Sequence, residues 1–254
     1  MIKHIDDHYP LVEEDRLVTE ELTVRQLTGR DESHLVALSG GHRLQAAAAD
    51  AFLSLQSMAL EEGYQLAIAS SFRSFERQCV IWNGKATGLR EVHDDQGREI
   101  IMARLSPGEK VHAILRHSAL PGISRHHWGT DIDIFDEAAM PDDYALQLKP
   151  DEVTEGGIFD PLHCWLDEKM AMDQSCGFFR PYGIDRGGVA PERWHLSYAP
   201  CAVHCESACS EGMLERILAG ADIAQWEFVS TYLPELLRRY TEVPVDWCLK
   251  RYRN

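Results

Sequence analysis

The sequence has no uninterrupted apolar run of about 18 residues, the shortest length that spans a lipid bilayer as a helix. It also has few basic side chains, with 25 Lys and Arg against 41 Asp and Glu and a formal net charge of -16 at pH 7. Proteins that bind nucleic acid or anionic membrane surfaces do so through clustered Lys and Arg. We therefore expect neither a nucleic-acid partner nor insertion in a membrane.

The N-terminal segment Met1–Pro10 lacks the basic stretch and following apolar stretch of an export signal. As the sequence stands, we expect a cytoplasmic protein, or a periplasmic one if a signal has been trimmed. The 7 cysteines are an odd number in a chain long enough to fold without disulfides. Reduced thiols are therefore the simpler interpretation.

The sequence does contain enough apolar residues for a core, at 44% of 254 residues. Residues 1–40 mix short apolar pieces with charges and predict an irregular N-terminal wrapping segment. Residues 41–200 carry the motifs described below, and residues 201–254 predict amphipathic helices. We expect a central domain with a helical C-terminal extension.

Within the central region, apolar spacing predicts a helix over His42–Glu62, followed by a short strand over Tyr64–Ser70. Ser74 is a good N-cap for a helix that runs to about Asn83. Residues 83–104 are polar and poorly periodic, which indicates a long loop or lid. Further helices are expected over residues 106–119, 160–172, 211–219 and 223–240.

The most informative stretch is Ser124–Asp136, a histidine-rich turn that leads into an acidic strand. His126 and His127 are two potential imidazole ligands, and Gly129 allows a sharp bend. Because side chains alternate along a strand, Asp131, Asp133 and Phe135 share one face and Ile132 and Ile134 the other. The stretch therefore resembles half of a metal site.

A catalytic zinc ion takes three protein ligands of the His or carboxylate type and keeps a fourth position open. His126 and Asp133 supply two such ligands, and His195 supplies a third. Glu192 has the right chemistry for a general base beside them. In a regular strand Glu192 and His195 would face opposite sides, so this hypothesis requires a turn, bulge or helical step between them.

Three motifs occur together and in order: Ser70-Ser71-Phe72-Arg73-Ser74-x-x-x-Gln78, Ser124-x-His126-x-x-Gly129-x-x-x-Asp133 and Glu192-x-x-His195. Together they resemble the zinc D-alanyl-D-alanine carboxypeptidases and dipeptidases of the VanY type, within the LAS group of zinc peptidases. The resemblance covers about residues 40–200. It implies an α+β fold in which a small antiparallel sheet, flanked by helices, carries a zinc site.

The resemblance also implies roles for individual residues. One zinc ion per chain would be bound by His126, Asp133 and His195, with His126 chosen over His127 by the family's spacing. Glu192 would be the catalytic acid-base, and Arg73 would stabilise the oxyanion or hold substrate. Weaker candidates for substrate contacts are Ser71, Gln78, Ser124 and Trp194. The substrate would be a peptidoglycan-derived peptide or a D-Ala-D-Ala-type compound.

Two features depart from the family pattern. Asp131 stands where the family usually has a small residue, and it either orients a ligand histidine or is an ordinary hydrogen-bonded strand carboxylate. The N-terminus shows no export signal, although cross-linked peptidoglycan lies outside the cytoplasm. This second feature favours soluble muropeptides or a D,D-dipeptide as substrates.

Several alternatives stay open at this level. The protein is a D,D-carboxypeptidase, a D,D-dipeptidase or a peptidoglycan endopeptidase, and the choice between D,D- and L,D-specificity is equally open. A non-catalytic zinc-containing binding domain of the same fold, as in hedgehog signalling proteins, is the alternative from another class. A second metal site is conceivable at Cys201, His204, Cys205 and Cys209, against an interpretation as buried apolar residues. The oligomeric state is not predicted.

Overall fold

The computed structural model describes residues 21–243, and a four-stranded antiparallel sheet lies at its centre. The strand order is β3 (Leu66–Ser70), β4 (Asp131–Asp136), β6 (His195–Tyr198) and β5 (Phe178–Phe179). A separate hairpin pairs β1 (Leu35–Ala37) with β2 (Arg43–Gln45). The expected α+β class with a small antiparallel sheet flanked by helices is confirmed.

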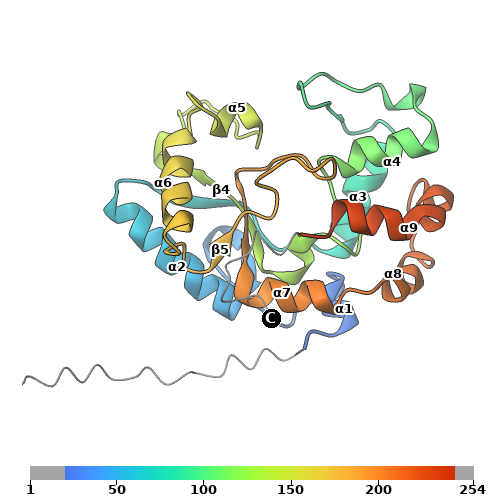
Figure 1. The fold of residues 1–254 in the computed structure, drawn as a ribbon, viewed down its shortest axis with the longest axis horizontal. Helices are drawn as coiled ribbons and strands as arrows, with labels where there is room; N and C mark the ends of the chain where they lie inside the picture. Colours follow the sequence, from blue (N-terminus) through green and yellow to red (C-terminus); the bar gives the residue numbers. More distant parts are fainter. Residues whose placement is uncertain (1–20, 244–254) are drawn as a thin grey trace, which may run out of the picture.

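Helices surround the sheet on several sides (Figure 1). α2 (Ala46–Glu61) and α6 (Asp160–Ala171) lie at the left of Figure 1, and α3 (Phe75–Ala86) and α4 (Pro107–Leu115) lie at the right. The remaining helices are α1 (Val24–Leu27), α5 (Pro150–Val153), α7 (Ala199–Ala208), α8 (Glu211–Leu218) and α9 (Trp226–Tyr240). None of the described helices is long and apolar enough to cross a membrane.

The alternation of β4 separates the hydrophobic core from the polar site. Ile132 and Ile134 are 0% and 1% exposed and pack in one cluster with apolar residues of α2 and α6. Burying an aliphatic side chain of this size contributes about 1.5–3 kcal/mol to the free energy of unfolding. Because these two residues point into the core, Asp131 and Asp133 must emerge on the opposite face of the strand.

A second core joins α3 and α4 to the C-terminal helices. Trp82, Ile114, Leu214 and Leu233 belong to this cluster, which also contains Leu27 from α1. The buried Trp82 indole donates a hydrogen bond of 2.9 Å to the carbonyl of Ala224. Residues that precede the central sheet in the sequence and residues that follow it therefore pack against the same helices, α3 and α4.

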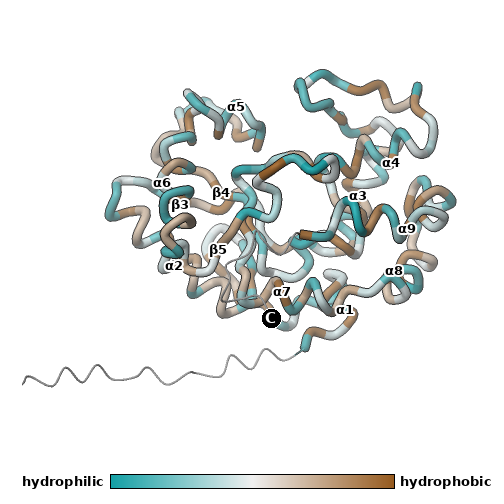
Figure 2. Tube along the Cα trace, viewed as in Figure 1, coloured by the Kyte–Doolittle hydropathy of each residue, from teal (hydrophilic) through white to brown (hydrophobic). Residues whose placement is uncertain are grey.

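Most predicted elements are found, with shifted boundaries. The predicted helix over His42–Glu62 begins only at Ala46, because Arg43–Gln45 pairs as strand β2. Helix α3 continues to Ala86, one turn beyond the predicted end at Asn83, and so shortens the predicted loop. In α4 the expected Ser106 and Glu109 capping box is present. The loop between α3 and α4 is largely hydrophilic, as its teal colour in Figure 2 shows.

Candidate metal centre

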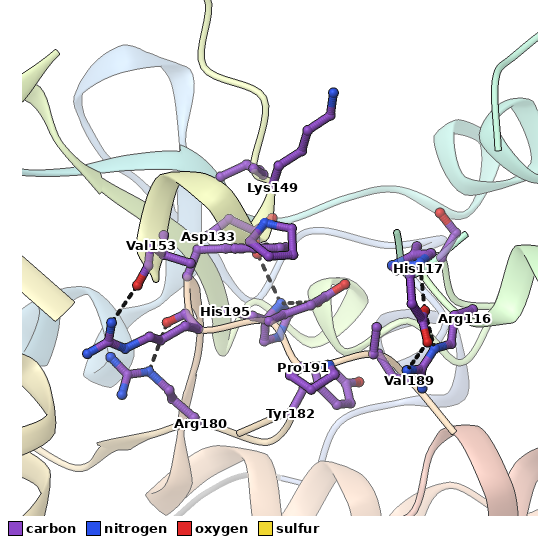
Figure 3. Close-up of a pocket in the computed structure, with 18 of the residues that line it drawn as sticks. Arg116, His117, Asp133, Lys149, Val153, Arg180, Tyr182, Val189, Pro191 and His195 are labelled. Carbon is purple, nitrogen blue, oxygen red and sulfur yellow. Dashed lines mark hydrogen bonds and ion pairs between the residues drawn. The ribbon is translucent and has the colours of Figure 1, made fainter. Parts of the chain in front are cut away.

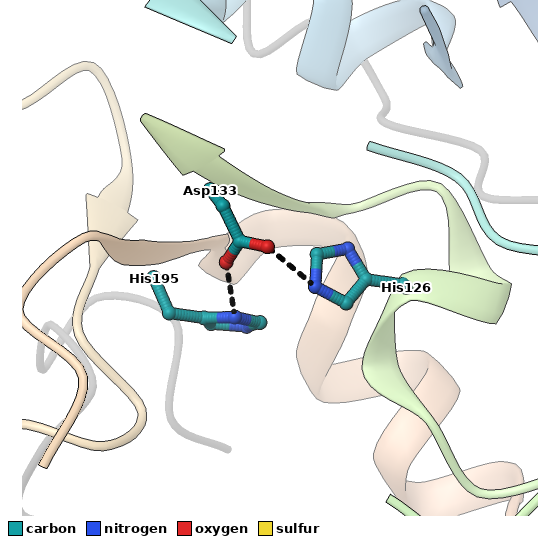
Figure 4. A group of neighbouring side chains, drawn as sticks. All are labelled: His126, Asp133 and His195. Atoms are coloured by element: carbon teal, nitrogen blue, oxygen red, sulfur yellow. Dashed lines mark hydrogen bonds and ion pairs between the residues drawn. The ribbon is translucent and has the colours of Figure 1, made fainter. Parts of the chain in front are cut away.

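His126, Asp133 and His195 converge from three separate elements (Figure 4). His126 lies on a short 3-10 helix, η3 (Arg125–Trp128), while Asp133 of β4 faces His195 of β6 directly in the sheet register. Their potential ligand atoms all lie within 4.8 Å of one another. Asp133 Oδ2 is 3.4 Å from His126 Nε2, and Asp133 Oδ1 is 3.0 Å from His195 Nδ1.

The local backbone explains how η3 delivers His126 to the sheet. Gly129 ends η3 with φ 71°, in the left-handed region that favours glycine. A Cβ at this position would also collide with the side chain of Leu35. The sharp bend expected from the sequence is therefore present, and it leads directly into β4.

The outer nitrogen of each imidazole is held by an oxygen. His126 Nδ1 lies 2.9 Å from the carbonyl oxygen of Ser71, which accepts a hydrogen bond and so fixes the proton on Nδ1. His195 Nε2 lies 3.0 Å from Asp131 Oδ1, which fixes the proton on Nε2 in the same way. The other ring nitrogens, His126 Nε2 and His195 Nδ1, face Asp133.

Asp131 is itself held rigidly. It is 0% exposed and accepts hydrogen bonds of 2.9 Å from Arg125 Nε and 3.0 Å from Ser197 Oγ. Burial acts to raise the pKa of Asp131, but Arg125 and His195 outweigh burial and hold that pKa well below its usual range. Of the two interpretations of Asp131, the geometry supports the one in which its carboxylate orients His195.

Burial and neighbouring charges also oppose each other at Asp133 and His195. Burial acts to raise the pKa of the Asp133 carboxyl, yet His126 and His195 beside it hold the pKa far below the usual range. Burial opposes a charged imidazole at His195, but Asp131 and Asp133 outweigh it and raise the pKa of His195 to about 10. A metal ion bound here would replace the proton that the two carboxylates hold on His195.

These three side chains fit a zinc ion by their chemistry. Two imidazole nitrogens and one carboxylate form, once the imidazoles are neutral, a ligand set that catalytic zinc sites use, with one position left for water. Among residues 21–243, this is the one group of three or more His, Cys, Asp or Glu side chains arranged to hold a metal. Cys205 instead packs in the second core, Cys201 is buried, and His204 is exposed.

His127, the alternative ligand, points elsewhere. Its Nδ1 lies 2.6 Å from the carbonyl oxygen of Arg73, and its Nε2 accepts a 3.0 Å hydrogen bond from the backbone N–H of Gly122. The ring is 0% exposed, and burial lowers its pKa to about 3. With both nitrogens engaged by the backbone, His127 fixes the conformation of the segment around the site.

Glu192 reaches the centre through a turn. The backbone N–H of His195 donates a 3.1 Å hydrogen bond to the carbonyl of Glu192, and β6 begins only at His195. As a result Glu192 Oε2 lies 3.8 Å from His195 Nδ1. Burial raises the pKa of Glu192 to about 7, although His195 and Arg73 oppose this rise. The irregular step that the sequence hypothesis required is therefore present.

Arg73 places a fixed cation beside these groups. Its guanidinium donates hydrogen bonds of 3.0 Å to Gln78 Oε1 and 3.2 Å to Ser70 Oγ, which orient it. Burial lowers the pKa of Arg73, and the carboxylates of Asp133 and Glu192 oppose this effect. An arginine in this setting stays charged.

Arg73, Glu192 and the three potential ligands border one large cleft, of about 1250 Å³. Viewed as in Figure 3, Arg180 and Val153 lie to one side of Asp133 and His195, and Arg116 and His117 lie to the other. Seven of the nine predicted site residues line it: Arg73, Ser124, His126, Asp133, Glu192, Trp194 and His195. Trp194 is only 7% exposed and also packs with Phe135 and Phe159.

The other two predicted residues lie behind the cleft wall. Ser71 is 6% exposed, and its hydroxyl accepts a 3.2 Å hydrogen bond from the backbone N–H of Arg43. Gln78 is 0% exposed and uses its amide to hold Arg73 and to donate a 2.6 Å hydrogen bond to Ala119. In the structure both residues support the site from behind.

Two residues of the cleft were missed by the sequence reasoning. Tyr182 lies with its ring 5.1 Å from that of His195, and its backbone carbonyl accepts a 2.9 Å hydrogen bond from the N–H of Glu192. Lys85 lines the cleft from the last turn of α3. Lys85 comes seven residues after Gln78, which is about two helical turns, so the two side chains lie on the same helix face. The sequence would have indicated this if the predicted helix had not ended at Asn83.

Comparison with known proteins gives matches of three kinds. An uncharacterised protein of Haemophilus influenzae is 48% identical over 104 residues, which is 39% of this chain and 71% of that protein. The solved structure of VanYB in complex with D-Ala-D-Ala covers 78% of this chain and 88% of its own, with 22% identity and a TM-score of 0.46. A vancomycin-resistance D,D-pentapeptidase VanY in complex with Zn(II) covers 71% and 88%, with 24% identity and a TM-score of 0.46.

The sequence profile of one family spans most of the chain. The VanY family, described as D-alanyl-D-alanine carboxypeptidase, matches residues 41–201. That stretch contains the three converging ligands, Glu192 and Arg73. From this match we conclude that the chain belongs to the VanY family of D-alanyl-D-alanine carboxypeptidases.

Proposed function

We propose that the protein is a zinc-dependent carboxypeptidase that hydrolyses the peptide bond before a C-terminal D-amino acid of peptidoglycan-type peptides. Family membership supports a peptidase acting on D-Ala-D-Ala-type peptides. The observation that carries the zinc-dependent mechanism is the group of His126, Asp133 and His195 with Glu192 beside it, 3.8 Å from His195.

The chemistry divides among the residues of the site. His126, Asp133 and His195 would hold a zinc ion, which would supply the Lewis acidity that polarises a carbonyl group and makes water more acidic. Glu192 takes a proton from the attacking water as the new C–O bond forms, and it delivers a proton to the amine as the C–N bond breaks. The products are a shortened peptide acid and a free D-amino acid.

Arg73 acts at the carbonyl oxygen. Negative charge develops on this oxygen as water attacks, and a preoriented cation in a buried site stabilises that charge. Gln78 and Ser70 hold the guanidinium in place, so little reorganisation is needed during the reaction. Ser124 and Trp194 line the same cleft and would contact the bound peptide.

The alternative of a non-catalytic binding domain is less well supported. A domain that only binds zinc has no need of a buried carboxylate beside the metal ligands or of a cation aimed at the same point. Both Glu192 and Arg73 are present and line the cleft. A dipeptidase or an endopeptidase would use the same groups, and these alternatives differ only in which substrates the cleft admits.

The role of Glu192 is tested by replacing it with alanine. We expect Glu192→Ala to keep its zinc and to lose at least about 100-fold in kcat, because acid-base catalysis contributes at least that much. Zinc content is measured by elemental analysis, and turnover by release of D-alanine from a peptide ending in D-Ala-D-Ala. Turnover equal to that of the wild type would exclude the mechanism.

A matched variant tests the ligand set. His195→Ala is expected to lower zinc content, whereas Glu192→Ala leaves it unchanged, although both lose activity. If His195→Ala retained a full equivalent of zinc, His195 would be removed from the ligand set.

A further inference from the structure

Lys85 is a cation on the cleft wall that has no role in the mechanism above. It extends from the last turn of α3 and lines the cleft together with Arg73, His117 and Glu192. Its ammonium donates a 2.7 Å hydrogen bond to the hydroxyl of Ser118. Within residues 21–243, no carboxylate lies within 4.0 Å of this ammonium to form an ion pair.

Lys85 has N–H donors that its hydrogen bond to Ser118 does not use. An ammonium group has three N–H donors, and the bond to Ser118 uses one. Gln78, two helical turns earlier on α3, is in contrast fully engaged with Arg73 and Ala119. Of the polar groups that α3 turns toward this wall, Lys85 is therefore the one able to bind a ligand.

The charges around Lys85 indicate what that ligand would be. Burial lowers the pKa of Lys85 to about 8; Glu192 acts against this shift, while Arg73 and Arg90 add to it. Burial also lowers the pKa of the nearby His117, so this imidazole resists taking up a second positive charge beside Lys85. A partly buried ammonium without an ion-pair partner is stabilised by an incoming anion.

We propose that Lys85, held by Ser118, binds the terminal carboxylate of the C-terminal D-amino acid and makes the enzyme an exopeptidase. This inference rests on the proposed function and deepens it. In a one-residue leaving group, the carboxylate is separated from the departing nitrogen by a single carbon. Glu192 must reach that nitrogen, and Glu192 and Lys85 line the same cleft. A cation that shares the cleft with Glu192 and keeps unused donors can therefore bind the carboxylate next to the departing nitrogen.

The test compares two ligands that differ only in their terminal charge: N-acetyl-D-Ala-D-Ala and its C-terminal amide. Kinetic constants are measured with the zinc-loaded wild type and Lys85→Met. Dissociation constants are measured by calorimetry in the Glu192→Ala background, with and without Lys85→Met, so that no turnover interferes. Zinc content and melting temperature confirm that each variant is folded.

For the acid ligand, we expect Lys85→Met to raise KM and the dissociation constant about 10- to 100-fold, the size of a charge-assisted hydrogen bond. For the amide, KM and the dissociation constant should both stay unchanged. The preference for the acid over the amide should therefore be lost. Lys85→Arg keeps the charge and should restore part of that preference.

Lys149→Met is the matched control. Lys149 also lines the cleft, but it is exposed, and in Figure 3 it extends away from Asp133 and His195. This variant makes the same change in net charge and should preserve the preference for the acid.

Two results would overturn the proposal: an unchanged preference for the acid in Lys85→Met, or an equal loss for both ligands. Failure of the proposed function is recognised separately. If the wild type hydrolysed neither compound, the carboxypeptidase assignment would fail, and binding to the Glu192→Ala protein would still decide the role of Lys85. Absence of binding by the acid would reject the carboxylate site as well.

Discussion

At the scale of single residues, Asp131 connects a predicted metal ligand to the surrounding protein. Its carboxylate lies between His195 Nε2 and the guanidinium of Arg125, and Arg125 in turn contacts Glu206 of α7 at 3.1 Å. Carboxylates in this position orient the ligand imidazole and raise its basicity. Asp131 is thus a positioning residue for His195.

Replacing Asp131 tests this role directly. Asp131→Asn keeps the shape of the side chain but removes its charge, and we expect zinc affinity to fall about 10- to 100-fold. The affinity is measured by competition with a chelator. Asp136→Asn is the control, because Asp136 is also buried on β4 but bonds to Gln65 and Ala138. Equal zinc affinity in Asp131→Asn and the wild type would contradict the positioning role.

The same scale shows what the sequence can and cannot predict about the site. His126, Asp133, Glu192 and His195 were predicted from the resemblance of three joint motifs to a known family, and the structure brings their side chains together. Whether a side chain reaches the cleft depends on tertiary packing, which spacing does not encode. Ser71 and Gln78 therefore lie behind the wall that they were expected to line.

At the scale of elements, Arg116 joins two loops at the rim of the cleft. It follows α4 and pairs with Asp95 of the loop between α3 and α4, at 2.8 Å. It also pairs with Asp185 at 2.6 Å and donates a 3.0 Å hydrogen bond to the carbonyl of Gly188. One side chain thus ties together two loops that line the cleft.

We expect Arg116→Ala to loosen both loops. Loss of about 1 kcal/mol of substrate binding corresponds to a KM about fivefold higher. Hydrogen exchange should also become faster over residues 93–98 and 184–188. The control is Arg98→Ala, because Arg98 pairs with Asp94 inside one loop. If hydrogen exchange over these two loops were unchanged in Arg116→Ala, the loops would be held by other contacts.

Element boundaries were less predictable than element types. The α4 capping box and the β4 alternation were read correctly, because each depends on residues close together in sequence. β2 was predicted as helix, since pairing with β1 decides its conformation and propensity does not. The short extension of α3 past Asn83 was missed for a similar reason: the end of a helix depends on the residues that pack against it.

At the scale of the whole molecule, a buried histidine makes stability depend on pH. His163 of α6 is 0% exposed, and its Nδ1 lies 3.3 Å from Arg180 Nη2. Within the described residues, its Nε2 has no hydrogen-bond partner. Burial, reinforced by Arg180 and Arg193 and opposed by Asp160, lowers the pKa of His163 to about 3. The folded protein therefore resists protonation of this ring.

The sign of the effect follows from this lowered pKa. An unfolded histidine has a pKa of about 6.5, so between about pH 6.5 and pH 3 the unfolded state binds a proton that the folded state does not. The free energy of unfolding should therefore fall as pH falls through this range. His163→Gln should make that slope shallower by about 1 kcal/mol per pH unit, measured by urea denaturation. An equal slope in His163→Gln and the wild type would contradict the account.

The central claim for the molecule is metal-dependent removal of one C-terminal D-amino acid, and mass spectrometry of the products tests it most directly. The zinc-loaded protein is incubated with a peptidoglycan pentapeptide that ends in D-Ala-D-Ala, beside Glu192→Ala loaded with zinc in the same way. We predict that the wild type shortens the peptide by one alanine and that Glu192→Ala leaves it essentially intact. An unchanged peptide in the presence of bound zinc, or equal release by the two proteins, would contradict the account.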